Sequence, residues 1–303
     1  MKLVRFIYNE EENYGVLIEN KRILSLSTLS SSKEYSIPKK LEKLISQNHQ
    51  VIKEVEKIIR EARKKHSESV IYNLDEVTLL APIAFPPKII CLGLNYYDHA
   101  AEARAEIPSE PVIFMKPHTT ITGPNQPIVK PSFVKQLDYE AELVIVIGKK
   151  GKNIPVERAG EYIFGYTIMN DVSARDVQFK DKQWTRGKSF DTFAPIGPCI
   201  TTANQIGNPN DLRIQAWVNG ELRQNSSTKN MVFNVYQIVH HLSRVMTLEP
   251  CDIIATGTPA GVGAFMKPPK FLQDGDKIEI KIENIGTLQN EVIEKQKLTE
   301  FVN

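Results

Sequence analysis

Asp138-Tyr139-Glu140-Ala141-Glu142-Leu143-Val144-Ile145-Val146-Ile147-Gly148 is the stretch that says most about the fold, because acidic residues lead directly into an apolar run. Alternate side chains of a β-strand share a face, so a continuous strand would point Asp138, Glu140 and Glu142 the same way. The Val-Ile-Val-Ile run is apolar on both faces, which predicts a strand buried on both sides. At least two carboxylates therefore enter a largely buried environment together.

Buried neighbouring carboxylates need compensation. Two carboxylates about 6–7 Å apart repel by roughly 2–3 kcal/mol at an effective dielectric constant of about 20, and burial adds a desolvation cost. Protonation, a basic side chain or a cation would offset that cost. Ligands that are all oxygen suit Mg²⁺, Mn²⁺ or Ca²⁺. The alternative is an exposed acidic strand end that only begins a core strand.

A further acid, Asp171, follows the apolar segment Gly165 to Met169. It stands where a buried strand would reach the surface, which is a usual place for a ligand. The alternative interpretation is a helix N-cap, because aspartate is favoured at that position.

A histidine and a glutamate are three residues apart in the alanine-rich segment Asn95 to Ala103, which favours a helix. His99 and Glu102 would share one face of that helix. A carboxylate beside an imidazole orients the ring and raises its basicity, so the pair could act as a general base. A surface His/Glu pair without catalytic function is the alternative.

Two other segments carry polar groups next to small residues. Lys188, within Arg186-Gly187-Lys188-Ser189-Phe190-Asp191, could stabilise an oxyanion, or it could simply be solvated. Thr258 lies in Thr256-Gly257-Thr258-Pro259-Ala260-Gly261-Val262-Gly263 after the apolar Ile253-Ile254, where small residues let backbone approach a ligand closely. Its hydroxyl could bind a carboxylate, and a plain turn is the alternative.

The chain changes character near residue 80. Strand-like pieces come first, at Leu3 to Tyr8, Tyr14 to Glu19 and Arg22 to Leu26. After Pro38, apolar residues recur at spacings of three, four and seven, which predicts a helix. Pro82, Pro86 and Pro87 mark a boundary. We therefore expect a small N-terminal α+β domain over residues 1–80 and a larger domain over residues 85–296.

The larger domain is predicted to be rich in β-strands. Short apolar, β-branched runs alternate with turn residues, and one helix is expected at Val232 to Val245. The runs are Ile89 to Leu92, Val112 to Met115, Glu142 to Ile147, Tyr162 to Met169, Ile253 to Ala255 and Lys277 to Ile282. The predicted fold class is α+β, mainly β.

Composition excludes several classes of protein. A net charge of +2 over 303 residues predicts neither nucleic-acid nor membrane binding. Three widely spaced cysteines without a C-x-x-C pair argue against a disulfide framework or a thiolate zinc site. No stretch reaches transmembrane length, and the start lacks the apolar region of a signal peptide. A cytoplasmic location is the default expectation.

Taken together and in order, these segments resemble the fumarylacetoacetate hydrolase family from about Lys88 to Val292. The matching motifs are Gly-x-Asn-Tyr-x-x-His-Ala-x-Glu at 93–102, Phe-x-Lys-Pro at 114–117, Asp-Tyr-Glu-x-Glu-Leu at 138–143, Gly165-Tyr166 with 170–176, Gly-Lys-Ser-Phe-Asp at 187–191, and 256–263. Each motif is weak alone, and six in order are highly specific. The resemblance implies a mixed β-roll catalytic domain, usually in a homodimer.

The resemblance also implies residue roles. The metal ligands would be Glu140, Glu142 and Asp171, holding Mg²⁺ or Mn²⁺. His99 and Glu102 would form the base dyad, carried on a lid that orders when substrate binds. Lys188 would steady developing negative charge, and Arg175, Gln178 and Thr258 would line the substrate pocket. The short leading segment and the single catalytic copy look most like bacterial members with oxaloacetate decarboxylase or acylpyruvate hydrolase activity.

The expected function is therefore C–C bond cleavage of a small 2-oxo acid through an enolate held on the metal. The metal would act as a Lewis acid, and Lys188 would stabilise the charge where it develops. The same site could instead isomerise an unsaturated 2-oxo acid, as in a 2-hydroxyhepta-2,4-diene-1,7-dioate isomerase. A binding or regulatory protein that keeps only the fold is the alternative of another class.

Overall fold

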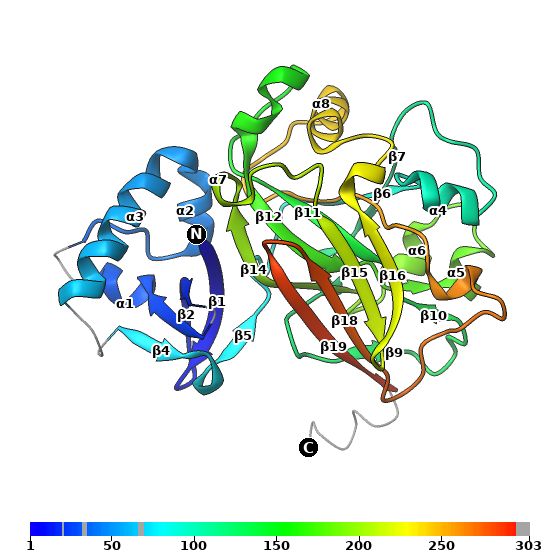
Figure 1. The fold of residues 1–303 in the computed structure, drawn as a ribbon, viewed down its shortest axis with the longest axis horizontal. Coiled ribbons are helices and arrows are strands. Elements are labelled where there is room, and N and C mark those ends of the chain that lie inside the picture. Colours follow the sequence, from blue (N-terminus) through cyan, green and yellow to red (C-terminus); the bar gives the residue numbers. More distant parts are fainter. Residues whose placement is uncertain (20, 32–34, 66–69, 295–303) are drawn as a thin grey trace.

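The computed structural model of the chain describes residues 1–19, 21–31, 35–65 and 70–294. Its strands and few helices confirm the predicted α+β, mainly β class (Figure 1). The larger sheet has twelve strands in the order β4-β3-β2-β1-β14-β12-β11-β17-β6-β7, with β5 on β1 and β8 on β14. These strands are β1 (Lys2–Tyr8), β2 (Glu11–Ile18), β3 (Arg22–Ser25), β4 (Ile71–Asn73), β5 (Thr78–Leu80), β6 (Ile89–Gly93), β7 (Val112–Lys116), β8 (Ile121–Thr122), β11 (Ala141–Ile147), β12 (Ile163–Asn170), β14 (Ala194–Thr202) and β17 (Ile253–Ala255).

The N-terminal strands extend the same sheet as the rest of the chain. Strand β1 pairs with β14, so that Leu3 lies opposite Ile200. Strands β1 to β5 and the first three helices form the smaller lobe at the left of Figure 1.

A second sheet, of five strands, crosses in front of β11 and β12 in Figure 1. It has the order β16-β15-β18-β19-β9 and consists of β9 (Ile128–Lys130), β15 (Arg213–Val218), β16 (Glu221–Ser227), β18 (Lys277–Ile282) and β19 (Gly286–Glu294). Two short strands, β10 (Leu137–Asp138) and β13 (Ser173–Ala174), pair with each other. This two-layer arrangement gives the larger part a roll with a core between its sheets.

Strand β11 is buried on both faces, as its Val-Ile-Val-Ile run predicted. Leu143 and Ile145 belong to the core that also holds Ile280 and Leu288 of the five-stranded sheet. Val144 and Val146 belong to the other core, which includes apolar residues of the N-terminal helices. The polar groups that enter β11 at its first residues are therefore carried into the interior.

The helices are short except for two. They are α1 (Leu26–Ser31), α2 (Leu41–Ser46), α3 (Asn48–Lys65), α4 (Tyr97–Glu102), α5 (Arg175–Gln178), α6 (Thr185–Lys188), α7 (Ala203–Ile206) and α8 (Val235–Val245), with 3-10 turns at 74–76, 118–120, 156–162, 228–230 and 263–265. Helix α8 starts three residues later than predicted, because Asn234 caps it. The Asn234 side chain accepts from the backbone N–H groups of Tyr236 and Gln237.

Two predictions in the N-terminal part need correction. The single helix expected after Pro38 is two helices, α2 and α3, which separate at Gln47. The Ser46 hydroxyl donates to the Lys43 carbonyl at the end of α2, a local bond that competes with helix continuation. Strand β2 begins at Glu11 because Asn9 and Glu10 adopt positive φ angles of 48° and 65° in a tight turn from β1.

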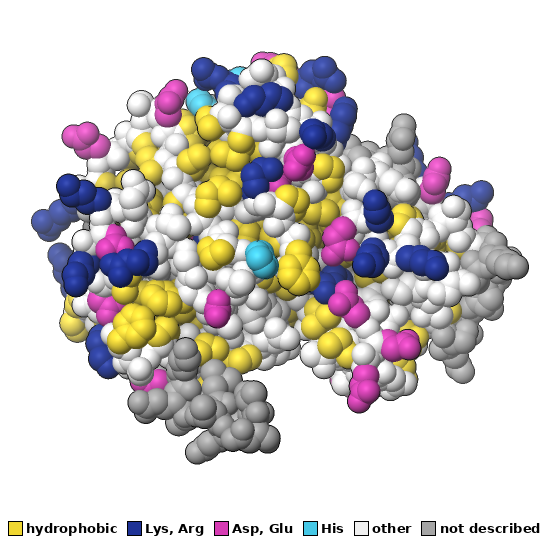
Figure 2. All heavy atoms as spheres, turned by 180° about the vertical axis from the view of Figure 1, so that it is seen from behind, with side chains coloured by type: hydrophobic (Ala, Val, Ile, Leu, Met, Phe, Trp, Pro, Cys, Tyr) yellow, Lys and Arg dark blue, Asp and Glu magenta, His cyan; other side chains and the backbone are white. Residues whose placement is uncertain are grey.

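The scattered surface charges and the buried cysteines are those expected from the small net charge and the wide cysteine spacing (Figure 2). In Figure 2, hydrophobic side chains gather toward the middle of the face opposite to that of Figure 1, and acidic and basic side chains are scattered around them. Cys91, Cys199 and Cys251 are buried and free, as small apolar residues would be. Among the helices of the described residues, none combines the length and apolar character needed to cross a bilayer.

Candidate functional site

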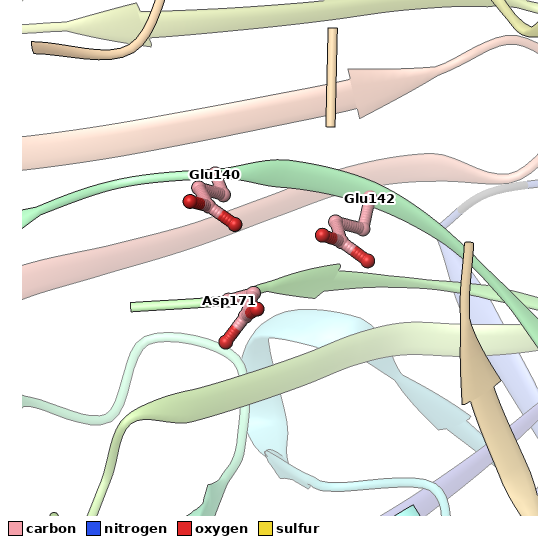
Figure 3. A group of neighbouring side chains, drawn as sticks. All are labelled: Glu140, Glu142 and Asp171. Carbon is pink, nitrogen blue, oxygen red and sulfur yellow. The ribbon is translucent and has the colours of Figure 1, made fainter. Parts of the chain in front are cut away.

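Three acidic side chains converge in the interior, although they come from two segments of the chain. Strand β11 carries Glu142 and follows Glu140, and Asp171 follows β12 (Figure 3). The antiparallel register places Ala141 opposite Asn170, and the Asp171 N–H donates to the Glu140 carbonyl at 2.9 Å. One oxygen from each carboxylate lies within 4.8 Å of the others, and all three residues are buried. The register of one strand pair therefore assembles the cluster.

Asp138 does not join this cluster, which corrects the prediction of one continuous acidic strand face. The strand breaks between β10 and β11 at Tyr139 and Glu140. The Asp138 carboxylate accepts from the Arg175 Nε at 2.9 Å and from the backbone N–H groups of Gly263 and Ala264. Asp138 thus ties Arg175 to the loop after β17.

Basic side chains surround the acids. The Lys188 Nζ donates to Glu140 Oε2 and to Asp171 Oδ2, each at 2.8 Å. Arg175 Nη2 lies 2.7 Å from Glu140 Oε1. Lys116, at the end of β7, donates to the second carboxylate oxygen of Asp171. The possibility that Lys188 is a solvated surface lysine is excluded, because its side chain is buried.

The pKa values of Glu140 and Glu142 are shifted in opposite directions. Burial alone would raise the pKa of Glu140, but Lys188 and Arg175 lower it to about 2. Glu142 has the opposite shift. Burial, with the negative charges of Asp171 and Glu140, raises the pKa of Glu142 well above its ordinary value. Burial would lower the pKa of Lys188, yet Asp171 and Glu140 raise it.

The cluster suits a hard divalent cation. Oxygen Oε2 of Glu142 accepts from the Gly257 N–H at 2.8 Å, but its Oε1 is buried and has no hydrogen-bond partner among the described residues. An unpaired buried carboxylate oxygen is costly unless a cation occupies its lone pairs. Carboxylate oxygens are the ligands that Mg²⁺ and Mn²⁺ prefer. Glu140, Glu142 and Asp171 are therefore the residues able to hold such an ion.

His99 and Glu102 share one face of helix α4, as their spacing predicted. The His99 Nδ1 lies 2.8 Å from Glu102 Oε1. The other Glu102 oxygen accepts from the Gly261 N–H at 2.9 Å, which anchors α4 to the loop after β17. With Nδ1 occupied, the remaining ring nitrogen of His99 is the one available for proton transfer.

A cavity of about 220 Å³ connects the dyad to the acids. Its polar lining consists of His99, Glu140, Arg175, Gln178, Lys188 and Thr258, and its apolar lining includes Leu92, Phe114, Phe179, Trp184 and Phe265. The nine residues predicted from the sequence therefore lie at one place: six line the cavity, and Glu102, Glu142 and Asp171 contact or adjoin those six. An imidazole, two basic side chains and a carboxylate thus face one small, partly open cavity.

Sequence analysis missed two residues of this site. Lys116 belongs to the quoted Phe-x-Lys-Pro motif, and its alternation with Phe114 on β7 was a signal that it points inward. Gln224 is fully buried on β16, and its side-chain amide donates to the Thr258 hydroxyl at 2.8 Å. No pattern in its own segment distinguishes Gln224 from a surface glutamine.

Comparison with known proteins gives consistent matches over most of the chain. Residues 88–293 match the family described as fumarylacetoacetate (FAA) hydrolase, C-terminal. The chain is 44% identical over 287 residues to oxaloacetate tautomerase YisK of Bacillus subtilis (strain 168), covering 92% of this chain and 95% of the relative.

Two solved structures resemble this fold closely. A fumarylacetoacetate hydrolase from Exiguobacterium antarcticum has a TM-score of 0.81 and 40% identity, covering 97% of this chain and 100% of that one. Maleylpyruvate hydrolase from Sphingobium sp. SYK-6, solved with manganese(II) and pyruvate, has a TM-score of 0.79 and 31% identity, covering 97% of this chain and 99% of that one.

Proposed function

Because the chain belongs to the fumarylacetoacetate hydrolase family, we propose that it is an enzyme that moves a proton beside the keto group of a small 2-oxo acid. The first candidate reaction is keto–enol interconversion of oxaloacetate. The observation that carries this proposal is that His99 of the His99–Glu102 pair and Glu140 of the Glu140–Glu142–Asp171 cluster line one cavity. The name of the Bacillus subtilis relative supports the choice of substrate.

We propose Mg²⁺ or Mn²⁺ as the cofactor, held by Glu140, Glu142 and Asp171. When bound, the ion would polarise the 2-oxo group as a Lewis acid and so acidify the neighbouring carbon. The manganese in the maleylpyruvate hydrolase structure supports an ion of this kind.

The chain's own residues supply the remaining chemistry. His99 takes a proton from C3 of the keto acid, and the C2 oxygen takes one up to complete the enol; in the other direction the enol oxygen loses its proton and His99 returns one to C3, while Glu102 holds the ring. Two N–H groups of the Lys188 ammonium are committed to Glu140 and Asp171, which leaves a third for the oxygen that gains charge. Gln178 and Thr258 are the neutral donors of the cavity lining for a substrate carboxylate.

C–C bond cleavage, which the sequence analysis favoured as the expected reaction, is the second candidate. Loss of CO₂ from C4 of oxaloacetate, or attack of a water activated by His99 on the acyl carbon of an acylpyruvate, would leave the same three-carbon enolate, which then takes up a proton to give pyruvate. The likeness to maleylpyruvate hydrolase, solved with pyruvate, favours keeping this reaction in the test.

One assay separates the two candidates. The enol form of oxaloacetate is dissolved in the presence of the Mn²⁺-loaded protein, its ultraviolet absorbance is followed, and pyruvate is measured with lactate dehydrogenase. Faster decay of the enol signal without extra pyruvate is expected for a tautomerase. Matching pyruvate formation would identify a decarboxylase. Neither change, with acetylpyruvate also intact, would contradict both reactions.

We also propose a homodimer in the cytoplasm. Strand β7 ends the twelve-stranded sheet and exposes Val112 and Met115, so a second copy of the chain could cover this edge. Three buried free cysteines suit a reducing compartment. Light scattering coupled to size-exclusion chromatography tests the dimer. A monomeric mass at micromolar concentration would contradict it.

We propose that residues 85–296 carry the catalytic domain and that residues 1–80 form an accessory domain. The start of the family match at residue 88 and the nearby prolines support this division. The pairing of β1 with β14 means that the accessory part depends on the larger part for its place in the sheet.

A further inference from the structure

Gln224 does not line the cavity itself but contacts Thr258, which does. It sits on β16, is fully buried, and bridges strand β11 to the loop after β17. Its Oε1 accepts from the Ala141 N–H at 3.0 Å. Its Nε2 donates to the Thr258 Oγ1 and to the Pro259 carbonyl, both at 2.8 Å. Both the oxygen and the nitrogen of the Gln224 side-chain amide are therefore hydrogen-bonded.

These contacts leave the amide a single orientation. In the reversed orientation, the amide NH₂ would face the Ala141 N–H, and the amide oxygen would face the Pro259 carbonyl. That orientation loses two hydrogen bonds and sets like groups against each other in the interior. The donor side of Gln224 is consequently held against Thr258.

A hydroxyl that accepts a hydrogen bond from a fixed donor must direct its own proton elsewhere. Thr258 lines the cavity, and within the described part of the chain its hydroxyl donates to no protein acceptor. We propose that Gln224 is a positioning residue that makes the Thr258 hydroxyl a hydrogen-bond donor toward a substrate carboxylate. This inference rests on the proposed function, because it needs a carboxylate in the cavity.

The same hydrogen bonds of Gln224 set the spacing between the acidic residues and Thr258. Ala141, which Gln224 accepts from, stands between Glu140 and Glu142 in the chain. The glutamine therefore couples the start of β11, where Glu140 and Glu142 flank Ala141, to the loop that carries Thr258. A ligand with a carboxylate at each end would sense this spacing, which a flexible hydroxyl alone would not provide.

A double-mutant cycle tests the proposal, with oxalate as the probe. Oxalate affinity is measured by calorimetry at saturating Mn²⁺ for the wild type, Gln224→Met, Thr258→Val and the double variant. A hydrogen bond to a charged group corresponds to an affinity change of about tenfold to a hundredfold. Each single variant is expected to weaken oxalate binding by that range, and the double variant to lose no more than Thr258→Val. Thr258→Ser should retain near-wild-type affinity.

Asn290→Leu is the matched control. Asn290 is also a buried amide that donates to two backbone carbonyls, those of Gly123 and Gln126, but it does not line the cavity. The Asn290→Leu substitution should lower the melting temperature and leave oxalate affinity unchanged. If Gln224→Met does not fold, Gln224→Glu replaces it, because the carboxyl placed there has at most one proton for two acceptors. Its smaller loss of affinity should also vanish in the Thr258→Val background.

The remaining outcomes overturn the proposal in distinguishable ways. An affinity loss from Gln224→Met that persists in the Thr258→Val background would make Gln224 a purely structural residue. Unchanged affinity in Gln224→Met would remove it from the site altogether. Unchanged affinity in Thr258→Val would refute the role of Thr258, while the oxaloacetate assay would still decide the proposed function on its own.

Discussion

The Lys188 ammonium lies 2.8 Å from a carboxylate oxygen of Asp171, and both groups are buried. The same nitrogen lies 2.8 Å from Glu140, so one lysine joins an acid that precedes β11 to an acid that follows β12. Arg175 and Lys116 occupy other oxygens of the same acids. Positive groups thus contact every carboxylate oxygen of Glu140 and Asp171, whereas the Glu142 Oε1 has no hydrogen-bond partner in the described part of the chain.

Replacing Lys188 should lower both the turnover and the melting temperature of the metal-free protein. The melting temperature of the metal-loaded protein should change much less. Lys188→Met leaves two buried carboxylates less compensated, so the protein should melt lower in chelator. Mn²⁺ should restore most of the melting temperature, because the cation supplies the missing positive charge. Turnover should remain about a hundredfold or more lower, which is typical of a lost oxyanion donor. Exposed Lys150→Met serves as control, and a normal rate in Lys188→Met would end the proposed role.

Glu142→Gln should separate metal binding from folding. The substitution keeps the shape of the side chain and its acceptor for the Gly257 N–H, but removes a buried charge next to two others. Mn²⁺ affinity measured by calorimetry should drop by about a hundredfold or more, while the chelator-treated variant melts no lower than the wild type. Glu157→Gln, on the surface, should change neither quantity. Wild-type Mn²⁺ affinity in Glu142→Gln would refute the ligand assignment.

His99→Ala should slow proton transfer without changing the fold or the metal site. A positioned general base contributes about a hundredfold to ten-thousandfold to the rate. The enol-decay rate should fall by that range, and Glu102→Gln should fall less, because the ring keeps its place but loses the charged partner. The exposed His118→Ala is the matched histidine control. Equal rates in His99→Ala and wild type on every substrate would remove the dyad from the mechanism.

Asp252 gives a pH dependence outside the catalytic site. Its side chain is buried at the start of β17, with Lys88 Nζ 2.7 Å away. Burial raises the pKa of Asp252, although Lys88 and the Glu249 N–H counter the shift. The folded state therefore holds this proton more tightly than the unfolded state, which favours folding at low pH. The ordinary pKa of an aspartate is 3.8, and the pKa of Asp252 in the folded protein lies above it. The contribution is lost as the pH rises through this higher, folded-state pKa.

Chemical denaturation of Asp252→Asn from pH 4 to pH 7 tests this sign. The free energy of unfolding should fall less steeply with rising pH than in the wild type. Asn290→Leu, which changes a buried group that does not titrate, should run parallel to the wild type. A steeper fall in Asp252→Asn would contradict the direction of the shift.

Much of the catalytic region could be predicted because its signals are local. The runs at 253–255 and 277–282 are strands with the predicted bounds. His99 and Glu102 follow from helical spacing alone, and the family resemblance is confirmed by the match over residues 88–293. The roles of the site residues stay predictions until the variants are measured.

The errors have a common cause. Alternation along Asp138 to Glu142 assumed an unbroken strand, whereas pairing of Asp138 with Ser173 ends the first strand early. Apolar spacing predicts one helix after Pro38. That spacing continues across Gln47, but the helix is interrupted there. Periodicity reports which residues are buried, but breaks in backbone direction depend on partners far away in the chain.

The sequence by itself determined the buried apolar strand at whose start Glu140 and Glu142 lie, the His99–Glu102 spacing, and the kind of ion that oxygen ligands suit. Only the tertiary structure decided that Asp171 meets those glutamates, that Lys116 and Lys188 share its carboxylate, and that Gln224 reaches Thr258. Local patterns follow from the geometry of one strand or helix. Contacts between segments 17 to 55 residues apart follow from strand register and core packing, which no single segment encodes.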